Sequence, residues 1–357
     1  MHNQQLIERL NQQHKLSHAQ WEQLIATYQP ADAAYAQNLA HQLTVARFGR
    51  KIFFRGIIEY TNYCKNDCRY CGIRHSNPHL KRYRLSEAQI LACCAAGYEN
   101  GFRTFVIQGG EDPYFTDQRL VPLLRHIRQQ YPDCAITLSL GERSYQSYQR
   151  LFAAGADRYL LRHETACQAL YEKWHPARQT FANRRRCLWQ LKAIGYQVGC
   201  GMMVGAPFQT VASLADDMVF ITKLQPQMLG LGPFIPHSQT PFRHFAAGNT
   251  QLTTFILSLC RILKPDVLLP ATTALGTVES NGRQQGVLAG CNVVMPNLSP
   301  LAVRKQYLLY DNKAGVNENA ASGIQNLTDQ MAQIHYTVLK GRGDFQPDSA
   351  LRRNEHD

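Results

Sequence analysis

Three cysteines stand close together early in the chain, at Cys64, Cys68 and Cys71, directly after an apolar run from Ile52 to Tyr60. Their spacing suits a 4Fe-4S cube, in which three thiolates bind three irons and the fourth iron stays open to an outside ligand. With eleven cysteines in 357 residues, such a spacing would arise by chance in roughly one such chain in a hundred. The sequence therefore predicts an iron–sulfur site with one open position.

A structural zinc ion is the main alternative interpretation of the same cysteines. Such sites close with four tetrahedral ligands, and His75 is the nearby residue that could supply the fourth. The total number of cysteines, eleven, is odd. The remaining eight are scattered and lie mostly in apolar segments. This distribution favours reduced, buried thiols over a disulfide framework.

The composition is typical of a soluble globular protein. Hydrophobic residues make up 45% and charged residues 18% of the chain, and no run of about eighteen apolar residues is present to span a bilayer. The first residues lack the charged-then-apolar pattern of a signal peptide, so we expect a cytoplasmic protein with no membrane partner. The net charge of +12 is dispersed, and its one tight run, Arg184 to Arg186, lies in a helical pattern. We therefore expect anionic small-molecule substrates and no nucleic acid.

Short apolar strand patterns alternate with helical patterns after the first fifty residues. The helices have start and stop signals, such as the capping box Ser86–Gln89 and the glycines Gly101, Gly155 and Gly195. The eight expected strands are Ile52–Tyr60, Thr104–Gln108, Ala135–Leu140, Arg158–Arg162, Gln197–Val204, Met228–Ile235, Leu268–Ala271 and Asn292–Met295. Eight βα units predict an α/β fold, a parallel (β/α)8 TIM-type barrel over residues 51–310. A doubly wound sheet has a similar alternation, and the number of strands is what favours the barrel.

Two smaller regions flank this barrel in the sequence. Residues 1–50 are expected to form a helical extension, with a capping box at Ser17–Gln20, and to close one end of the barrel. Residues 311–357 are expected to form a C-terminal helical cap and a mobile tail. Within them Thr328–Leu339 has a helical pattern, and the tail would be Gly341–Asp357.

Polar and glycine-rich residues recur where the expected strands end. In a TIM-type barrel the carboxyl ends of the strands carry the active site, so periodicity and chemistry predict the same face. Turns are polar in any barrel, and Gly141, Pro207 and Asn297 taken singly are best explained as turn residues. The stretches are Glu59–Asn62, Gln108–Asp112, Ser139–Glu142, Arg162–Thr165, Gly205–Pro207, Pro233–His237, Ala271–Thr273 and Met295–Asn297.

Two arginines, Arg158 and Arg162, lie four residues apart on one expected strand. Both side chains would therefore face the same way, together with that of Leu160. Arginines inside a barrel are costly unless an anion meets them. Glu164 continues the same face, which leaves open an internal network of ion pairs; the functional interpretation is a clamp for substrate carboxylates.

The cysteine triad and the glycine-rich Gln108–Glu111 stretch resemble the radical S-adenosylmethionine (SAM) superfamily. Within that superfamily the chain closely resembles the HydE family of FeFe-hydrogenase maturases, from about Arg55 to about Tyr310. The stretches that carry this closer resemblance are Asn62–Arg74, Gly110–Tyr114, Ala156–Thr165, Gly232–His237 and Pro270–Ala274.

The resemblance implies one 4Fe-4S cluster and SAM as cofactors. Cys64, Cys68 and Cys71 would hold the cluster, and SAM would chelate its open iron through its amino and carboxylate groups. Residues that match SAM-binding positions of the family are Tyr70, Gly109, Gly110, Glu111, Ser139, Glu164 and Arg184. Residues that match its anion and substrate pocket are Arg158, Arg162, Thr272, Thr273 and, less closely, Tyr310.

The resemblance also implies an activity. Reductive cleavage of SAM would give a 5′-deoxyadenosyl radical in a pocket that excludes water. The family is thought to act on an organometallic precursor, an iron with carbonyl, cyanide and cysteine ligands, during assembly of the hydrogenase H-cluster. The expected partners are this small anionic substrate, an external one-electron donor and other hydrogenase maturases.

Other interpretations remain open. Within the superfamily these are a methylornithine-synthase-like carbon mutase and a biotin-synthase-like sulfur inserter. The latter needs a second cluster, and Cys134, Cys167 and Cys200 fall near strands that could carry its ligands. A non-enzymatic scaffold that binds metal or nucleic acid would have no use for the Gln108–Glu111 stretch or for a pair of buried arginines.

The chain departs from the family pattern in a few places. Some members carry further cysteines near the C-terminus for a second cluster, whereas residues 311–326 here contain none, so a single cluster is predicted. Phe208 stands where a glycine is usual in the turn after Gly205, and Gly109 replaces a serine of some relatives. Neither change removes a side chain that we assign to chemistry.

Overall fold

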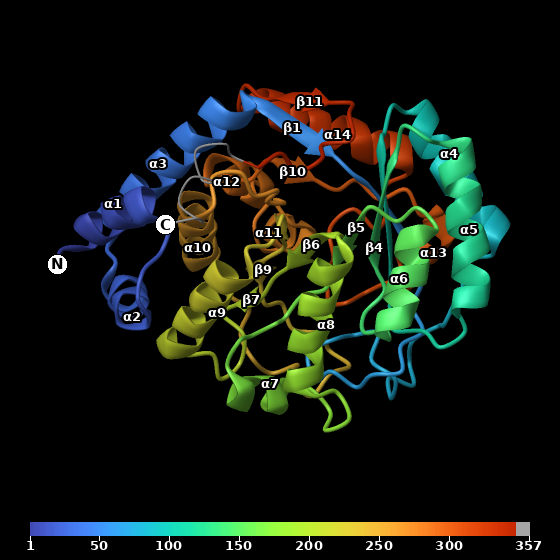
Figure 1. Cartoon of the computed structure of the whole chain (residues 1–357), viewed down its shortest axis with the longest axis horizontal. Coiled ribbons are helices and arrows are strands. Elements are labelled where there is room, and N and C mark those ends of the chain that lie inside the picture. Colours follow the sequence, from blue (N-terminus) through green and yellow to red (C-terminus); the bar gives the residue numbers. More distant parts are fainter. Residues whose placement is uncertain (348–357) are drawn as a thin grey trace.

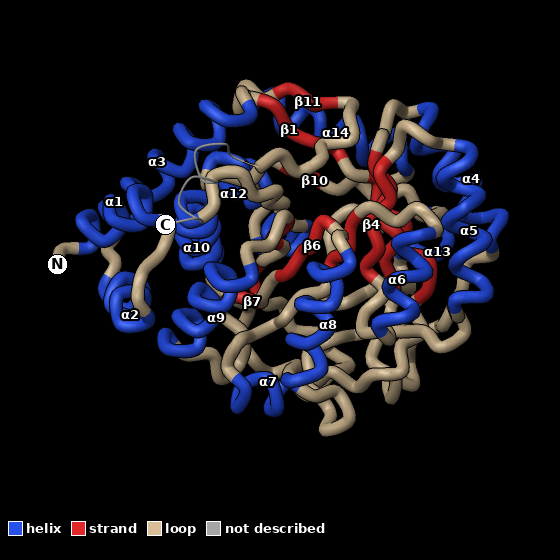
Figure 2. Tube along the Cα trace, in the orientation of Figure 1, coloured by secondary structure: helices blue, strands red, loops and turns tan. Residues whose placement is uncertain are grey.

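Parallel strands form the centre of the structure, and helices surround them (Figures 1 and 2). The computed structural model describes residues 1–347. The strands are β1 (Lys51–Phe54), β2 (Gly56–Thr61), β3 (Thr104–Gly109), β4 (Ala135–Ser139), β5 (Arg158–Leu160), β6 (Gln197–Cys200), β7 (Met203–Val204), β8 (Met228–Leu229), β9 (Gly232–Pro233), β10 (Val293–Val294) and β11 (Thr337–Leu339).

The order of the strands around the centre follows their order in the chain. A parallel ladder runs β2-β3-β4-β5-β6-β8. Single parallel bridges continue it from β8 to Leu268 and from Pro270 to β10, and β10 pairs with β1. A last bridge joins Asn297 to β2. The α/β fold of TIM type predicted from the eight-fold alternation is confirmed.

Several expected strands are shorter or divided. The expected strand Ile52–Tyr60 divides into β1 and β2 at Arg55, and the fifth and sixth strands divide into β6/β7 and β8/β9. Glycine permits one of these breaks, because a Cβ on Gly201 would lie 1.8 Å from the carbonyl oxygen of Gly230. Leu268–Ala271 takes part only through isolated bridges. Apolar sequence alone cannot place such breaks, because both halves remain buried and apolar.

Helices occupy the intervals between the strands, and several begin at the expected caps. The Ser86 hydroxyl accepts a hydrogen bond from the Gln89 amide (3.2 Å), and α8 ends at Gly195 with φ of 104°. The barrel helices are α4 (Glu87–Glu99), α5 (Asp117–Gln130), α6 (Tyr145–Ala153), α7 (Gln168–Trp174), α8 (Phe181–Ile194), α9 (Val211–Leu224), α10 (Thr250–Leu263), α11 (Thr273–Val278), α12 (Gly282–Leu288) and α13 (Leu301–Arg304).

The N-terminal extension consists of α1 (Asn3–Gln13), α2 (His18–Thr27) and α3 (Pro30–Phe48). These helices pack against α9, α10 and α12, on the left side of the view in Figure 1. Tyr28 stacks on Phe255 of α10 with ring centroids 4.2 Å apart, and Trp21 is fully buried. The extension therefore covers the outer side of these helices, and the expectation that it closes one end of the barrel is wrong. Within residues 1–347 no helix is both long and apolar enough to cross a membrane.

The C-terminal region contains a helix, α14 (Ala320–Gln333), and strand β11. The helix begins at Asn319, whose side chain accepts a hydrogen bond from the Ser322 amide (2.8 Å). Thr337–Leu339, expected to be helical, instead pairs with β1 in parallel. The β-branched Thr337 and Val338 suit this edge position, and the neighbouring edge of β1 overrides the local helical pattern.

Residues 341–347 close the end of the barrel at which the strands begin, so the expected mobile tail is wrong for this part. Arg158 donates a hydrogen bond to the Asp344 carboxylate (2.6 Å), and Arg342 donates to Asp157 (3.0 Å). Arg55 donates to the carbonyl of Gly343 (3.3 Å). The fully buried Arg158 needs such an anionic partner. The rest of the expected tail, residues 348–357, lies outside the described residues.

Replacing Asp344 by alanine is expected to lower the free energy of unfolding by about 1–2 kcal/mol at pH 7, because the one-third-exposed carboxylate neutralises a buried guanidinium. Partial burial alone would raise the pKa of Asp344, but hydrogen bonds and charges from Arg342 and Arg158 lower it to about 2. The difference between wild type and variant is therefore present above about pH 4 and disappears as the pH falls through 2. Urea unfolding of the iron-free protein across this range measures it.

Asp133→Ala is the matched control, because Asp133 makes an ion pair of 2.7 Å with Arg103 but is half-exposed. Its effect should stay below about 0.5 kcal/mol. Equal losses for the two variants would contradict the assigned role of residues 341–347.

Candidate active site

A cavity of about 390 Å³ lies at the carboxyl ends of the strands. This volume is within the usual range for small-molecule sites. The cavity is lined by every predicted site residue except Arg158. These residues are Cys64, Cys68, Tyr70, Cys71, Gly109, Gly110, Glu111, Ser139, Arg162, Glu164, Arg184, Thr272, Thr273 and Tyr310.

The cysteines lie on the long segment between β2 and α4, which backbone hydrogen bonds attach to neighbouring loops. The amide of Lys65 donates to the carbonyl of Glu111 (2.9 Å) in the turn after β3. The amide of Arg69 donates to the carbonyl of Trp174 (2.9 Å), and that of Gly72 donates to Leu309 (2.9 Å). The three bonds connect the cysteine segment to the turn after β3, to the end of α7 and to the segment after α13, so the surrounding barrel positions all three thiols.

All three cysteines line the cavity. Burial raises the pKa of each thiol. The charge of neighbouring cysteines raises the pKa further for Cys68 and for Cys71, which reaches about 12. Such mutual effects require proximity, and iron would replace the protons that these thiols carry. His75, the zinc ligand considered as an alternative, is exposed on the surface and does not line the cavity. Three thiols with an open side fit a 4Fe-4S cube better than a four-ligand zinc site.

The glycine-rich turn after β3 lies against the cysteine segment. A Cβ on Gly110 would lie 2.2 Å from the carbonyl oxygen of Tyr63 and 2.7 Å from the Cβ of Cys64, so only glycine fits there. Its neighbour Glu111 accepts a hydrogen bond from the Glu142 amide (3.0 Å). The turn therefore offers bare backbone and a fixed carboxylate beside the thiols, which fits the expected binding of the SAM methionine group.

Buried charges surround this half of the cavity. Arg184 donates to the Glu142 carboxylate (2.6 Å) and to the carbonyl of Arg162 (2.6 Å). Glu164 is buried, has a left-handed φ of 64°, and lies 3.1 Å from the guanidinium of Arg162 without the alignment of a hydrogen bond. A non-glycine residue held in this conformation is typical of functional sites. Arg184 thus positions the carboxylates, while Glu164 keeps an oxygen that a ligand amine or hydroxyl can use.

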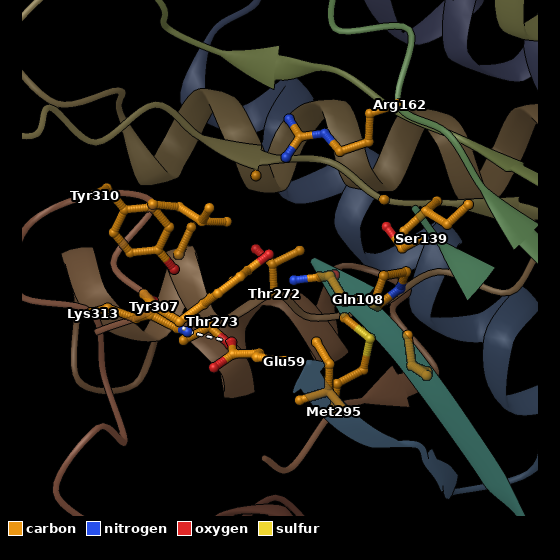
Figure 3. Close-up of a pocket in the computed structure, with 18 of the residues that line it drawn as sticks. Glu59, Gln108, Ser139, Arg162, Thr272, Thr273, Met295, Tyr307, Tyr310 and Lys313 are labelled. Carbon is orange, nitrogen blue, oxygen red and sulfur yellow. Dashed lines mark hydrogen bonds and ion pairs between the residues drawn. The ribbon is translucent and has the colours of Figure 1, made fainter. Parts of the chain in front are cut away.

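The other half of the cavity presents the expected anion-binding residues. Arg162, Thr272, Thr273 and Tyr310 surround one space in Figure 3. Two nitrogens of the Arg162 guanidinium and the Thr272 hydroxyl are buried without a hydrogen-bond partner. Burial raises the pKa of Tyr310 to about 12, so its hydroxyl remains a donor at neutral pH. Unpartnered donors that converge on one space fit a carboxylate ligand.

Arg158 does not reach this cavity, so its assignment to the substrate pocket is not supported. It begins β5, whereas Arg162 lies just after the strand ends at Leu160. Four residues along a strand cover about 13 Å, so two side chains on the same face lie at opposite ends of the barrel. Arg158 instead binds Asp344, the Thr104 hydroxyl (3.2 Å) and Gln197.

The structure adds residues to the site that the sequence did not single out. Gln179 accepts a hydrogen bond from the Cys68 thiol (3.3 Å). Glu59 makes a buried ion pair with Lys313 and accepts a hydrogen bond from Asn297 (2.9 Å); Figure 3 shows the ion pair as a dashed line. Glu59 belonged to a recognised strand-end stretch, but Lys313 lies alone in a polar loop and no sequence signal could have found it.

Lys313→Met is expected to lower the free energy of unfolding by about 2–3 kcal/mol, because it leaves the Glu59 carboxylate buried without its cation. The double variant Glu59→Gln/Lys313→Met should recover most of this loss, since neither charge then remains. Urea unfolding of the two variants and of Glu59→Gln measures the coupling. Additive losses would contradict a direct interaction of the two charges.

Comparison with known proteins agrees with this geometry. The Radical SAM superfamily model matches residues 58–221. The FeFe hydrogenase maturase subunit HydE of Thermotoga maritima is 42% identical over 286 residues, which are 80% of this chain and 81% of that protein. The 3-methylornithine synthase of Methanosarcina acetivorans is 28% identical over 249 residues, 69% of each chain.

A solved structure supports the fold. The crystal structure of the methylornithine synthase PylB superimposes with a TM-score of 0.81 at 23% identity, covering 94% of this chain and 97% of that chain. At this identity the likeness concerns the fold alone. The matching model, the identity with HydE and the three thiols at the glycine-rich turn lead to one conclusion. The chain is an enzyme of the radical SAM superfamily and, within it, belongs to the family of the hydrogenase maturase HydE.

Proposed function

We propose that this enzyme cleaves SAM reductively and directs the resulting radical at a cysteine-ligated iron carbonyl/cyanide precursor during maturation of FeFe-hydrogenase. The observation that carries the proposal is the cavity itself, in which a three-thiol site and the unpartnered donors of Arg162 and Thr272 face one space. The 42% identity with HydE supports the choice of substrate. Such a substrate carries the cysteine carboxylate that these donors suit.

The residues of the chain have separate tasks in this proposal. Cys64, Cys68 and Cys71 hold one 4Fe-4S cluster, which supplies an electron to the sulfonium of SAM when both are bound. The Gly109–Gly110 backbone admits the methionine group close to the thiols, and Glu111 and Glu164 bind its polar atoms. The remaining cavity wall includes Met203, Met228 and Met295, whose apolar side chains keep water away from the reacting centre.

We also propose that the chain holds a single cluster. Residues 311–357 contain no cysteine. Cys134 and Cys200, considered as ligands of a biotin-synthase-type second cluster, are fully buried, and neither they nor Cys167 lines the cavity. This placement disfavours the sulfur-insertion alternative.

A cell-free maturation assay tests the substrate. Apo-hydrogenase is incubated anaerobically with the other maturases, SAM and dithionite, with or without this protein. Hydrogenase activity that depends on its addition is the expected result. If activity does not depend on the protein, while incubation with lysine and SAM yields methylornithine, the carbon-mutase alternative replaces the proposal.

A further inference from the structure

Two exposed phenylalanines, Phe208 and Phe245, form an aromatic cluster with the buried Phe242 beside the cysteine segment. Phe208 and Phe245 are 53% and 39% exposed, and their rings lie 5.3 Å apart. Both contact Phe242, at 6.1 and 5.5 Å between ring centroids. Clustered exposed aromatic rings are typical of surfaces that bind a partner.

The backbone of Phe208 shows that this ring is kept at a conformational cost. Phe208 has φ of 67°, a left-handed conformation that bulky residues rarely adopt and that glycine adopts freely. Its side chain packs mainly on the rings of Phe242 and Phe245 and contributes little to the core. A glycine would serve the turn better, so the ring is better explained by a contact outside the chain.

Basic residues border the cluster. The ammonium of Lys173 lies 5.3 Å from the ring centre of Phe208, and Arg243 follows Phe242 directly. Arg243 and Arg74 line one shallow surface hollow, and Arg69, Lys173 and Arg243 are all exposed.

The acidic residues nearby already have partners. Asp67 accepts hydrogen bonds from Ser76 (2.8 Å) and lies 3.4 Å from Arg74. Glu172 accepts a hydrogen bond from Gln168 (2.8 Å). Glu172 remains an exposed carboxylate, but the exposed Arg69, Lys173 and Arg243 outnumber it. The surface is therefore apolar at its centre and carries a net positive charge around it, which is complementary to an acidic protein.

This surface is continuous with the cysteine segment. Arg69, which follows Cys68, donates its amide hydrogen to Trp174 (2.9 Å) and accepts one from Phe242 (3.3 Å). The indole of Trp174 donates to the carbonyl of Pro207 (2.8 Å), the residue before Phe208. A protein bound to this surface would lie close to the cluster site, because Phe242 is hydrogen-bonded to the backbone of Arg69, the residue that follows Cys68. In Figure 1, α7 and the blue segment after β2 lie along the same lower edge of the molecule.

We propose that this face, made of Arg69, Lys173, Phe208, Arg243 and Phe245 and supported by the buried Phe242, docks an acidic one-electron carrier protein. One electron leaves the reduced carrier and enters the oxidised cluster; no bond forms or breaks, and the cluster charge falls by one. The inference rests on the proposed function only in that the cluster must be reduced from outside.

The test compares a protein reductant with a chemical one. Holoenzyme variants Lys173→Glu, Arg243→Glu and Phe208→Gly are mixed anaerobically with photoreduced flavodoxin, an acidic carrier, or with dithionite. We expect each charge reversal to raise the Kd for flavodoxin about tenfold and to slow the reduction of the cluster by flavodoxin, followed as bleaching of its absorbance, about tenfold. Both effects should be larger at low salt than at high salt. Phe208→Gly should weaken binding about fivefold while raising the melting temperature. Reduction by dithionite should stay within about twofold of wild type.

Two control variants carry the same changes on another surface. Arg125→Glu reverses an exposed charge on α5, and Trp189→Ala removes an aromatic side chain on α8 that is 41% exposed. Both should bind flavodoxin as the wild type does. The proposal is overturned if the controls lose as much affinity as the face variants, or if the face variants bind flavodoxin normally. It is also overturned if Phe208→Gly dissociates a dimer of the wild type, which would make the face a self-interface. SAM cleavage with dithionite tests the enzyme activity independently.

Discussion

Cys68→Ala is expected to abolish cleavage of SAM, lowering the rate at least about a thousandfold to background. Three thiolates hold the cube in this family, and a cluster with one of them removed is lost or distorted. The structure adds that Cys68 lines the cavity and that its thiol donates a hydrogen bond to Gln179 (3.3 Å). Anaerobically reconstituted protein, dithionite and SAM should give 5′-deoxyadenosine and methionine from the wild type alone, as measured by chromatography.

The control is Cys200→Ala, which removes a fully buried thiol that does not line the cavity. It should keep its iron and its cleavage rate. Wild-type protein should contain about four iron atoms per chain. Cleavage by Cys68→Ala at the wild-type rate would contradict the assignment of the ligands, and about six to eight irons would contradict the single cluster.

Arg162→Ala is expected to keep the cluster and its spectrum but to lower kcat/KM for the carboxylate substrate about a hundredfold. Two of its guanidinium nitrogens are buried without a hydrogen-bond partner, although one of them lies 3.1 Å from the Glu164 carboxylate. Both still have the capacity to donate hydrogen bonds to the carboxylate of the proposed substrate. Arg162→Lys should recover only part of the loss, because an ammonium cannot form the paired hydrogen bonds of a guanidinium. The effect is measured as the rate of substrate turnover, with wild type and variants compared at equal iron content per chain.

Arg158→Ala is a matched control at the start of β5. Because Arg158 binds Asp344 at the opposite end of the barrel, its removal should lower stability and leave KM unchanged. If Arg158→Ala raises KM as much as Arg162→Ala does, the separation of the two arginines is contradicted. If Arg162→Ala leaves turnover unchanged, Arg162 serves only its ion pair with Glu164.

The sequence predicted the elements of the barrel because periodicity and caps are local properties. It also predicted the cavity residues that belong to compact motifs, such as the Cys64–Cys71 spacing and the glycine turn. The spacing of four residues separates Arg158 and Arg162 by about 13 Å, but the sequence could not tell which of them reaches the cavity, because it did not place the ends of β5. Nor could it place Lys313, whose partner Glu59 lies 254 residues earlier.

The pairing of Arg158 with Asp344 has a consequence for biosynthesis. The two residues are 186 positions apart in the chain. Arg158 is therefore synthesised long before Asp344, and the growing polypeptide must keep its guanidinium without this counter-ion while the second half of the barrel is synthesised. The first strands can associate as they leave the ribosome, but the barrel end stays uncompensated until Asp344 has emerged. Completion of this fold is therefore a late event in the synthesis of the chain.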